Sequence, residues 1–400
     1  MASKSSGSFA TRAVRAGQTH TAENEQSEPL FLTSSFRFAS AEQAAARFAN
    51  EEEGNIYSRF TNPTVRLFEQ RLAALDEAED CLATCSGMAA IMAAIMGICR
   101  AGSRLVASSQ LFGATFNLLE NYFAKFGVEV VIVPDSETDS WKKATGSKAD
   151  LLFLESPSNP QLEVYDIAAI ADIAHRAGAL LMVDNCICTP ALMKPLELGA
   201  DIAMYSATKY LDGQGRVLGG ALTGKSEILR ERVFPFLRCG GPAMSPFNAW
   251  TLAKSLETLL IRIQAMSATA DSLAHWLTEQ PTVTCVNYPF SPGYRRLDLA
   301  RRQQTAGGGL VSFSIAGGQP AAFRAINATQ RFSITANFGD AKATICHPAS
   351  TTHSRIDAQA RAQAGIDDGM IRISAGLEDP ADLREDLERI LAAGQNAAAT

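Results

Sequence analysis

Short apolar runs alternate with helix-like stretches over the middle of the chain. Five runs rich in β-branched or aliphatic residues have the length of buried strands, at residues 104–108, 128–133, 150–155, 179–184 and 201–206. Stretches with helical spacing of apolar side chains lie before and between these runs, at residues 65–78, 114–126 and 167–178. Strands that alternate with helices form mainly parallel sheets covered on both faces, so we predict an α/β fold.

The two ends of the chain have different patterns from the middle. Residues 1–62 hold few long periodic runs and predict an N-terminal arm of the kind that reaches a partner subunit. Residues 248–279 predict one long helix, and two further strands are expected within 307–318 and 368–379. The chain is therefore divided into an arm (1–62), an α/β domain (63–255) and a smaller C-terminal α+β domain (256–400).

Composition narrows the class of protein. The 400 residues are 46 % hydrophobic, enough for a large core, and the net charge of -6 does not suggest a nucleic-acid partner. The longest apolar run, residues 87–99, is too short to cross a membrane. Among the 8 Cys, the close pairs Cys81/Cys85 and Cys186/Cys188 lack CxxC spacing and a nearby His. We expect reduced thiols in a cytoplasmic protein, with no metal site.

A lysine and an acid stand at the ends of two predicted strands. Lys209 follows a strand that ends in hydroxyl residues, and a lysine so placed can bind an aldehyde cofactor while Ser206 and Thr208 bind its phosphate. Asp184 ends a hydrophobic strand, where a carboxylate can pair with the ring nitrogen of such a cofactor. Taken singly, Lys209 could be a solvated surface lysine and Asp184 a helix N-cap.

Four more segments carry polar groups suited to the same chemistry. Residues 84–90, TCSGMAA, form a small-residue turn before an apolar helix, which can bind phosphate or can simply be capped by Ser86. Residues 155–160, ESPSNP, present Asn159 in a loop fixed by prolines. Residues 57–64 carry a tyrosine and an arginine able to hold a phosphate. Arg372 lies between apolar residues of a strand, where a substrate carboxylate would be a good partner.

These six segments, in this order, resemble the Cys/Met-metabolism family of pyridoxal-phosphate enzymes from Thr11 to Asp379. The resemblance implies a PLP-dependent transferase fold of type I and the cofactor pyridoxal 5'-phosphate. It implies that Lys209 is the Schiff-base lysine and that Arg372 and Asn337 contact the substrate. The implied cofactor-binding residues are Tyr57, Arg59, Ser86, Gly87, Met88, Phe112, Asn159, Asp184, Ser206, Thr208 and Lys209.

The resemblance also implies an assembly. Tyr57 and Arg59 match residues that reach the cofactor phosphate of a neighbouring subunit, so the site requires at least a dimer. Members of the family are usually homotetramers built as two such dimers.

Two departures from the family pattern bear on the reaction. Phe112 stands where relatives have a tyrosine, so the ring can stack but has no hydroxyl for proton transfer. Residues 337–339 read Asn-Phe-Gly where many relatives have Ser-Leu-Gly. Together with residues 249–259 and 334–354, Phe112 resembles the branch that joins sulfide to O-succinyl-L-homoserine, releasing succinate and giving L-homocysteine for methionine biosynthesis.

Several alternatives stay open at the level of sequence. Within the family, the sulfur donor could be cysteine, the acyl group could be acetyl, or the reaction could be γ-elimination from cystathionine or methionine. Outside it, a nucleotide-binding protein would need GxGxxG after a strand or GxxxxGK[ST] between a strand and a helix. We find neither motif, so a nucleotide-binding protein is not expected.

Overall fold

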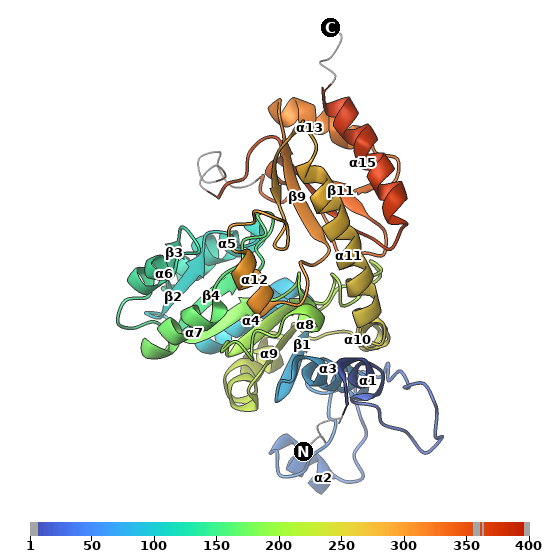
Figure 1. The fold of residues 1–400 in the computed structure, drawn as a ribbon. Coiled ribbons are helices and arrows are strands. Elements are labelled where there is room, and N and C mark those ends of the chain that lie inside the picture. Colours follow the sequence, from blue (N-terminus) through green and yellow to red (C-terminus); the bar gives the residue numbers. More distant parts are fainter. Residues whose placement is uncertain (1–6, 355–360, 362–363, 396–400) are drawn as a thin grey trace. The chain divides into compact units, whose positions relative to one another are not determined.

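The computed structural model describes residues 7–354, 361 and 364–395. The chain forms two compact units (Figure 1). The first unit comprises Met1–Ile98, Met204–Asp212 and Arg216–Leu260, and the second comprises Cys99–Ala203, Gly213–Gly215 and Ile261–Thr400. Within the described residues, no helix combines the length and the apolar character that crossing a membrane requires.

The large sheet confirms the predicted α/β class. Its seven strands have the order β1-β7-β6-β5-β4-β2-β3, and the pairs β2–β3, β2–β4 and β4–β5 are parallel. The strands are β1 (Asp80–Thr84), β2 (Arg104–Ser108), β3 (Glu129–Val133), β4 (Leu151–Glu155), β5 (Leu180–Asp184), β6 (Ile202–Ser206) and β7 (Gly220–Gly224). All five strands predicted in this region form within one residue of the expected bounds, whereas β1 and its antiparallel partner β7 were not predicted.

A string that fits GxxxxGK[ST] is present after all, contrary to the sequence-based interpretation. Residues 219–226 read GGALTGKS, but Gly220–Gly224 form β7, whose five residues are all buried. A Cβ atom at Gly220 would overlap the carbonyl oxygen of Ser86, so a glycine is needed where the two segments approach. The string therefore forms a strand, and not the phosphate-binding loop of a nucleotide-binding protein.

The helices of the first unit are α1 (Phe9–Arg15), α2 (Ala41–Phe48), α3 (Pro63–Asp76), α4 (Gly87–Ile98), the π-helical turn η3 (Ile228–Val233), α9 (Phe234–Gly240) and α10 (Pro246–Leu256). Of these, α3, α4 and η3 pack against β1 and β7, α1 and α10 pack on α3, and α9 packs on α4. Asn62 caps α3, since its side-chain oxygen accepts from the amide of Thr64 at 2.9 Å, and Pro63 occupies the first turn. The predicted helix at 248–279 is instead two helices, which break at Glu257 and Thr258.

Hydroxyl side chains account for this break. The hydroxyls of Ser255 and Thr258 donate to main-chain carbonyls, as does the amide of Thr258, which bonds Ser255 O at 3.2 Å. Such local bonds compete with the regular helical ladder, so α10 ends here and α11 (Leu259–Thr278) starts anew.

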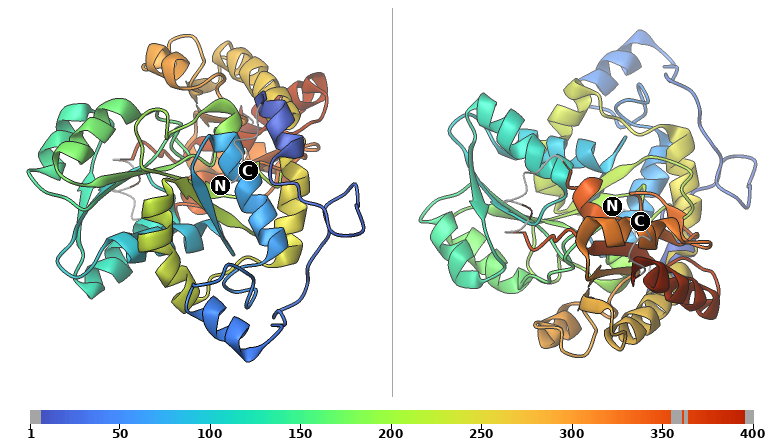
Figure 2. Two further views of the ribbon diagram at one scale, coloured as in Figure 1. Left: turned by 90° about the horizontal axis from the view of Figure 1, so that it is seen from below. Right: turned by 90° about the horizontal axis from the view of Figure 1, so that it is seen from above.

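Within the second unit, helices flank the strands of the large sheet. Figure 2 shows α7 (Ile167–Arg176) and the helical run that starts with α5 on opposite sides of these strands. The remaining helical elements are α5 (Gly113–Leu118), the turns η1 (Leu119–Phe123) and η2 (Ala124–Phe126), α6 (Thr138–Thr145), α8 (Thr189–Leu192), α12 (Leu297–Gln303) and η4 (Pro348–Ser350).

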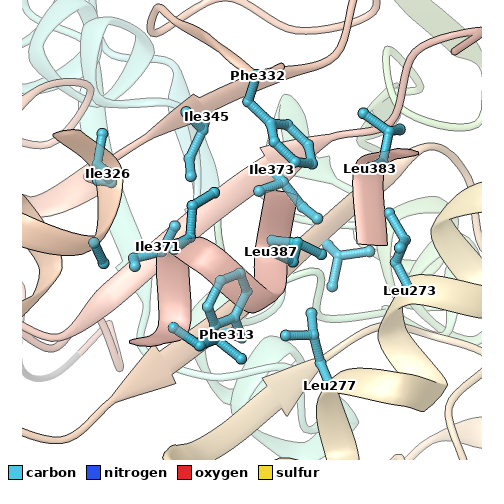
Figure 3. Packing of buried hydrophobic residues seen from close by; sticks show 14 of the residues in the cluster. Leu273, Leu277, Phe313, Ile326, Phe332, Ile345, Ile371, Ile373, Leu383 and Leu387 are labelled. Carbon is cyan, nitrogen blue, oxygen red and sulfur yellow. The ribbon is translucent and has the colours of Figure 1, made fainter. Parts of the chain in front are cut away.

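A second sheet follows in the order β10-β11-β12-β9-β8. Its strands are β8 (Val283–Asn287), β9 (Leu310–Ile315), β10 (Ser333–Ile334), β11 (Thr344–Cys346) and β12 (Met370–Ser374). Ile371 and Ile373 point into a core that α11, α13 (Gly318–Asn327) and α15 (Pro380–Gln395) cover (Figures 1 and 3). Because side chains alternate along a strand, Arg372 lies on the opposite face.

Candidate active site

Gly87 and Ser206 meet at the start of helix α4 in the first unit. A Cβ atom added to Gly87 would lie 2.9 Å from the Cβ of Ser206, so glycine is needed where the two segments approach each other. Ser86 also caps the helix, because its hydroxyl accepts from the amide of Ala89 at 3.2 Å. The turn therefore combines the capping role of Ser86 with a close approach of the Ser206 side chain to a helix N-terminus, where backbone amides can bind a phosphate.

Lys209 lies three residues beyond the end of β6. Its amide donates to Ser206 O at 3.2 Å, and the residue is half-buried and not solvated as a typical surface lysine would be. The hydroxyl of Thr208 accepts from the amide of Gly219 at 3.1 Å and lies 3.3 Å from its carbonyl oxygen. These contacts fix the turn that carries Ser206, Thr208 and Lys209 against the segment before β7.

The arm residues Tyr57 and Arg59 make other contacts. The guanidinium of Arg59 donates to the carbonyl of Arg238 and lies 4.7 Å from the ring centroid of Phe60. Tyr57 is 40 % exposed, and Arg59 is exposed too. Arg59 and Phe60 line a cavity of about 530 Å³ beside α3 and α9. The structure thus places Arg59 against α9 and the Tyr57 ring beside the Arg59 guanidinium, and both side chains retain exposed surface.

In the second unit, two buried carboxylates stand side by side where β4 and β5 end. Glu155 is 4 % exposed and Asp184 is 8 % exposed, and the two residues are partners in the parallel register. The oxygen Oδ1 of Asp184 accepts from the amide of Cys186 at 2.9 Å. Oxygen Oε2 of Glu155 accepts from the amide of Phe112, the residue before α5, at 3.1 Å. Asp184 thus lies at the carboxyl edge of the sheet, where ligands bind in such folds.

Arg372 is buried on β12, with 2 % of its surface exposed. Its Nη1 donates to Oδ1 of Asn159 at 2.8 Å, and Nη2 donates to the carbonyl of Ala336 at 2.7 Å and that of Asn337 at 3.4 Å. The guanidinium also lies 5.4 Å from the ring centroid of Phe338. Within the described part of the chain, every hydrogen bond of Arg372 goes to a neutral oxygen, which leaves its charge available to an anion.

His353 adds no positive charge to this region near pH 7. Burial, followed by the positive charges of Arg372 and Arg361, lowers the pKa of His353 to about 4. The imidazole is therefore neutral near pH 7, and its Nδ1 lies 2.8 Å from the hydroxyl oxygen of Thr352.

The structure thus brings the predicted residues together in separate groups. One group holds Ser86, Gly87, Met88, Ser206, Thr208 and Lys209; a second holds Phe112 and Asp184; a third holds Asn159, Asn337 and Arg372. Sequence reasoning noted that Glu155 ends a predicted strand, as Asp184 does, but gave it no role. It also missed the carbonyl of Ala336, for which a side-chain pattern gives no signal.

These residues fit pyridoxal phosphate. At the start of α4, Gly87 lets the Ser206 side chain come close to the helix amides, and these amides together with the Ser206 hydroxyl suit a phosphate. Lys209 supplies an amine, and Asp184 supplies a buried carboxylate for a pyridine nitrogen. Among the described residues, no cluster of three or more His, Cys, Asp or Glu side chains could hold a metal ion.

Comparison with known proteins identifies the family. O-succinylhomoserine sulfhydrylase from Pseudomonas aeruginosa is 54 % identical over 385 residues, covering 96 % of this chain and 95 % of that protein. The enzyme of the same name from Mycobacterium tuberculosis is 42 % identical over 388 residues, covering 96 % of each chain. A solved Campylobacter jejuni structure containing N'-pyridoxyl-lysine-5'-monophosphate has a TM-score of 0.93 and 32 % identity, covering 96 % of this chain and all of that one. The family model for Cys/Met metabolism PLP-dependent enzymes matches residues 10–392, and the chain belongs to that family.

Proposed function

We propose that this protein joins sulfide to O-succinyl-L-homoserine, giving L-homocysteine and succinate in methionine biosynthesis. The observation that supports an amino-acid substrate is the buried guanidinium of Arg372. Among the described residues, its hydrogen bonds go to neutral oxygens. The α-carboxylate of the substrate supplies the missing negative charge. The succinyl donor and the sulfide acceptor are supported by the identity to the two sulfhydrylase relatives.

Lys209 and Asp184 take the central roles in this proposal. When bound, pyridoxal phosphate supplies an electron sink for negative charge that develops on the amino acid. Lys209 holds the cofactor through Nζ and then moves protons at Cα and Cβ of the substrate. Asp184 keeps the ring nitrogen protonated, and its backbone partner, the amide of Cys186, fixes the orientation of the carboxylate.

Neighbouring groups bind the ends of the cofactor and the substrate. We assign the phosphate to Ser86, Gly87, Met88, Ser206 and Thr208, and the cofactor hydroxyl to Asn159. The oxygen of Asn159 is used by Arg372, and its amide nitrogen is the donor we assign to that hydroxyl. Asn337 lines the substrate side through the same main-chain segment that accepts from Arg372.

Phe112 bears on the choice of reaction. Its ring is assigned to stack on the cofactor, but it lacks the hydroxyl that could protonate a leaving group. General acid assistance of that kind is worth about 10²–10⁴-fold. A carboxylate such as succinate leaves without protonation, whereas a thiolate benefits from an acid. This favours γ-replacement of an acyl group over γ-elimination from cystathionine or methionine.

A substrate matrix tests the proposal. The rates with O-succinyl- and O-acetyl-L-homoserine are measured against sulfide and cysteine, together with cleavage of cystathionine and methionine. The proposal expects the highest kcat/KM for the succinyl ester with sulfide and weak cleavage of the thioethers. A preference for cysteine would favour cystathionine γ-synthase, a preference for the acetyl ester would favour an O-acetylhomoserine sulfhydrylase, and efficient thioether cleavage would favour a γ-lyase.

We further propose a cytoplasmic homotetramer, a dimer of dimers in which Tyr57 and Arg59 serve the partner's cofactor. Helix α2 of the arm has no buried residue, and Tyr57 and Arg59 remain exposed. All eight cysteines are free thiols, which agrees with a reducing compartment.

Subunit mixing tests the shared sites. Inactive Arg59→Ala and Lys209→Ala protomers are exchanged, and recovery of activity is expected because some hybrid sites carry neither change. A mixture of Arg59→Ala with Gly87→Trp serves as a second pair for the same geometry. Subunit exchange is first verified by mass. If activity does not recover in the exchanged mixture, the result contradicts sharing of the site.

A further inference from the structure

Glu155 is a buried acid that the proposed mechanism does not use. It ends β4, it is 4 % exposed, and it is the register partner of Asp184 on β5. Partners in neighbouring parallel strands direct their side chains to the same face of the sheet. The Glu155 carboxylate therefore lies on the face that carries Asp184, at the carboxyl edge of the sheet.

The main chain of Phe112 is one partner of the Glu155 carboxylate. Its Oε2 accepts from the amide of Phe112 at 3.1 Å. Phe112 immediately precedes α5, and its carbonyl accepts from the amides of Thr115 at 2.8 Å and Phe116 at 3.1 Å. A phenylalanine has no side-chain oxygen with which to cap the helix.

This arrangement reproduces half of a capping box with a residue from elsewhere in the chain. In a capping box, a carboxylate inside the helix accepts from the amide of the N-cap residue. Here the carboxylate comes from β4, 43 positions along the chain. The bond ties the start of α5 to the rigid sheet, and thereby fixes the backbone from which the Phe112 ring projects.

We propose that Glu155 is a positioning residue that orients the Phe112 ring against the cofactor. The inference rests on the proposed stacking of that ring. Aromatic stacking depends on the offset and tilt of the two rings, and both follow from where the backbone of Phe112 is held. The hydrogen bond is what matters here, so a neutral acceptor of the same length serves as well as the carboxylate.

The test compares Glu155→Gln, Glu155→Ala, Phe112→Ala and the Glu155→Ala/Phe112→Ala double variant. Cofactor affinity and the visible circular dichroism of the bound cofactor are measured on the full-length protein. Loss of an aromatic contact is worth up to about tenfold in affinity. We expect Glu155→Ala to weaken affinity by roughly that factor and to reduce the dichroic band, while Glu155→Gln stays within about threefold of the natural protein.

Asp150 provides a matched control. Its Oδ2 accepts from the amide of Arg104 at 2.8 Å, just before β4 begins, so it also joins a carboxylate to a main-chain amide of the same sheet. Asp150→Ala is expected to lower stability and to leave the dichroic band unchanged. A purely structural role for Glu155 would give the same pattern as Asp150.

Three outcomes would overturn the inference. In the first, Glu155→Gln matches Glu155→Ala, which shows that the charge and not the hydrogen bond is what counts. In the second, the loss of cofactor affinity from Glu155→Ala persists in full when Phe112 is already alanine, instead of falling below about twofold as a shared pathway requires. In the third, Phe112→Ala leaves cofactor affinity and dichroism unchanged. That result removes the stacking role of the ring but not γ-replacement, because product formation is measured separately.

Discussion

Arg71 and Arg372 are both almost completely buried, but their surroundings differ in charge. Arg71, on α3, forms ion pairs with Glu28 and Glu257, and Lys254 bonds both of these acids. It also donates to the carbonyls of Ala16 at 3.0 Å and Ala253 at 2.9 Å. Two cations and two anions therefore balance, and the cluster holds the arm against the rest of the first unit.

Arg372 is hydrogen-bonded, but among the described residues its hydrogen-bond partners include no anion that balances its charge. Its acceptors are one side-chain amide and two carbonyls, none of which carries a negative charge. His353, whose pKa is lowered to about 4, adds no second positive charge near pH 7. Leaving a buried cation unpaired is costly, so a protein that retains one gains little stability from it. Charge balance therefore distinguishes a buried arginine that anchors the chain from one that can bind a ligand.

Loss of Arg71 gives the largest expected effect on stability. Arg71→Met removes one cation and leaves Glu28 and Glu257 sharing Lys254, and breaking a buried pair costs about 3–5 kcal/mol. Urea unfolding at fixed protein and cofactor concentration measures this loss, and proteolysis of the arm should accelerate. The Arg71→Met/Glu28→Leu double variant restores charge balance and should be more stable than Arg71→Met. Equal stability of the two variants would contradict a balanced cluster.

Loss of Arg372 should instead appear in catalysis. Arg372→Leu removes the partner of the substrate carboxylate, which costs about 2–4 kcal/mol of binding, or roughly 30- to 1000-fold in kcat/KM. The unfolding midpoint in urea should change much less than for Arg71→Met, because the acceptors of Arg372 among the described residues are neutral oxygens. Cofactor absorbance should be retained. A variant that loses stability and cofactor together would show that Arg372 is an anchor like Arg71.

Acid should weaken the arm cluster. Burial alone raises the pKa of Glu28, but hydrogen bonds from Lys254 and Arg71 outweigh it and lower the pKa to about 2 from 4.5. A depressed folded-state pKa means that the stabilisation is complete above pH 4.5 and is lost as the pH falls toward 2. Between pH 7 and pH 3 the loss is at most about 2 kcal/mol. Unfolding at pH 7 and pH 3 should show a smaller acid loss for Glu28→Gln than for the exposed control Glu51→Gln. An equal loss in both would contradict the assignment.

Ligand-induced stabilisation is the smallest expected effect. L-Norleucine has an α-carboxylate and no leaving group, and at about ten times its Kd it should stabilise the protein by roughly 1.4 kcal/mol, a Tm rise of about 1–3 °C. Arg372→Leu should lose this rise, whereas Arg71→Met should keep it. Pentylamine, which lacks the carboxylate, is the control and should give no rise in either protein. A rise in Arg372→Leu equal to that in the natural protein would argue against carboxylate binding.

The strands of the large sheet show what the sequence could predict. β2 to β6 are short apolar runs bounded by polar residues, and burial of such a run leaves little choice of register. β1 and β7 were not predicted, because their sequences, DCLAT and GALTG, consist largely of small or polar residues. They form strands by pairing with each other. The helix break at Glu257 was missed for a similar reason, since Ser255 and Thr258 are compatible with helix until their hydroxyls bond the backbone.

The candidate site divides in the same way. The sequence placed Asp184 and Arg372 on buried strands, because a charged residue in an apolar run is costly without a partner. It could not predict the acceptors of Arg372, which are carbonyls of residues 336 and 337 brought close by the fold. Nor could it predict that Glu155 bonds the amide of Phe112. The cofactor and substrate roles of the individual residues stay predictions.

The most direct measurement combines a change in Arg372 with a change in the substrate. The kcat/KM for O-succinyl-L-homoserine and for its α-carboxamide is measured with sulfide in the natural protein and in Arg372→Leu. If Arg372 binds the α-carboxylate, the carboxamide should cost the natural protein about 30-fold or more and should cost the variant less than about threefold. The same penalty in both proteins would contradict the account, because it would show that the carboxylate is bound elsewhere.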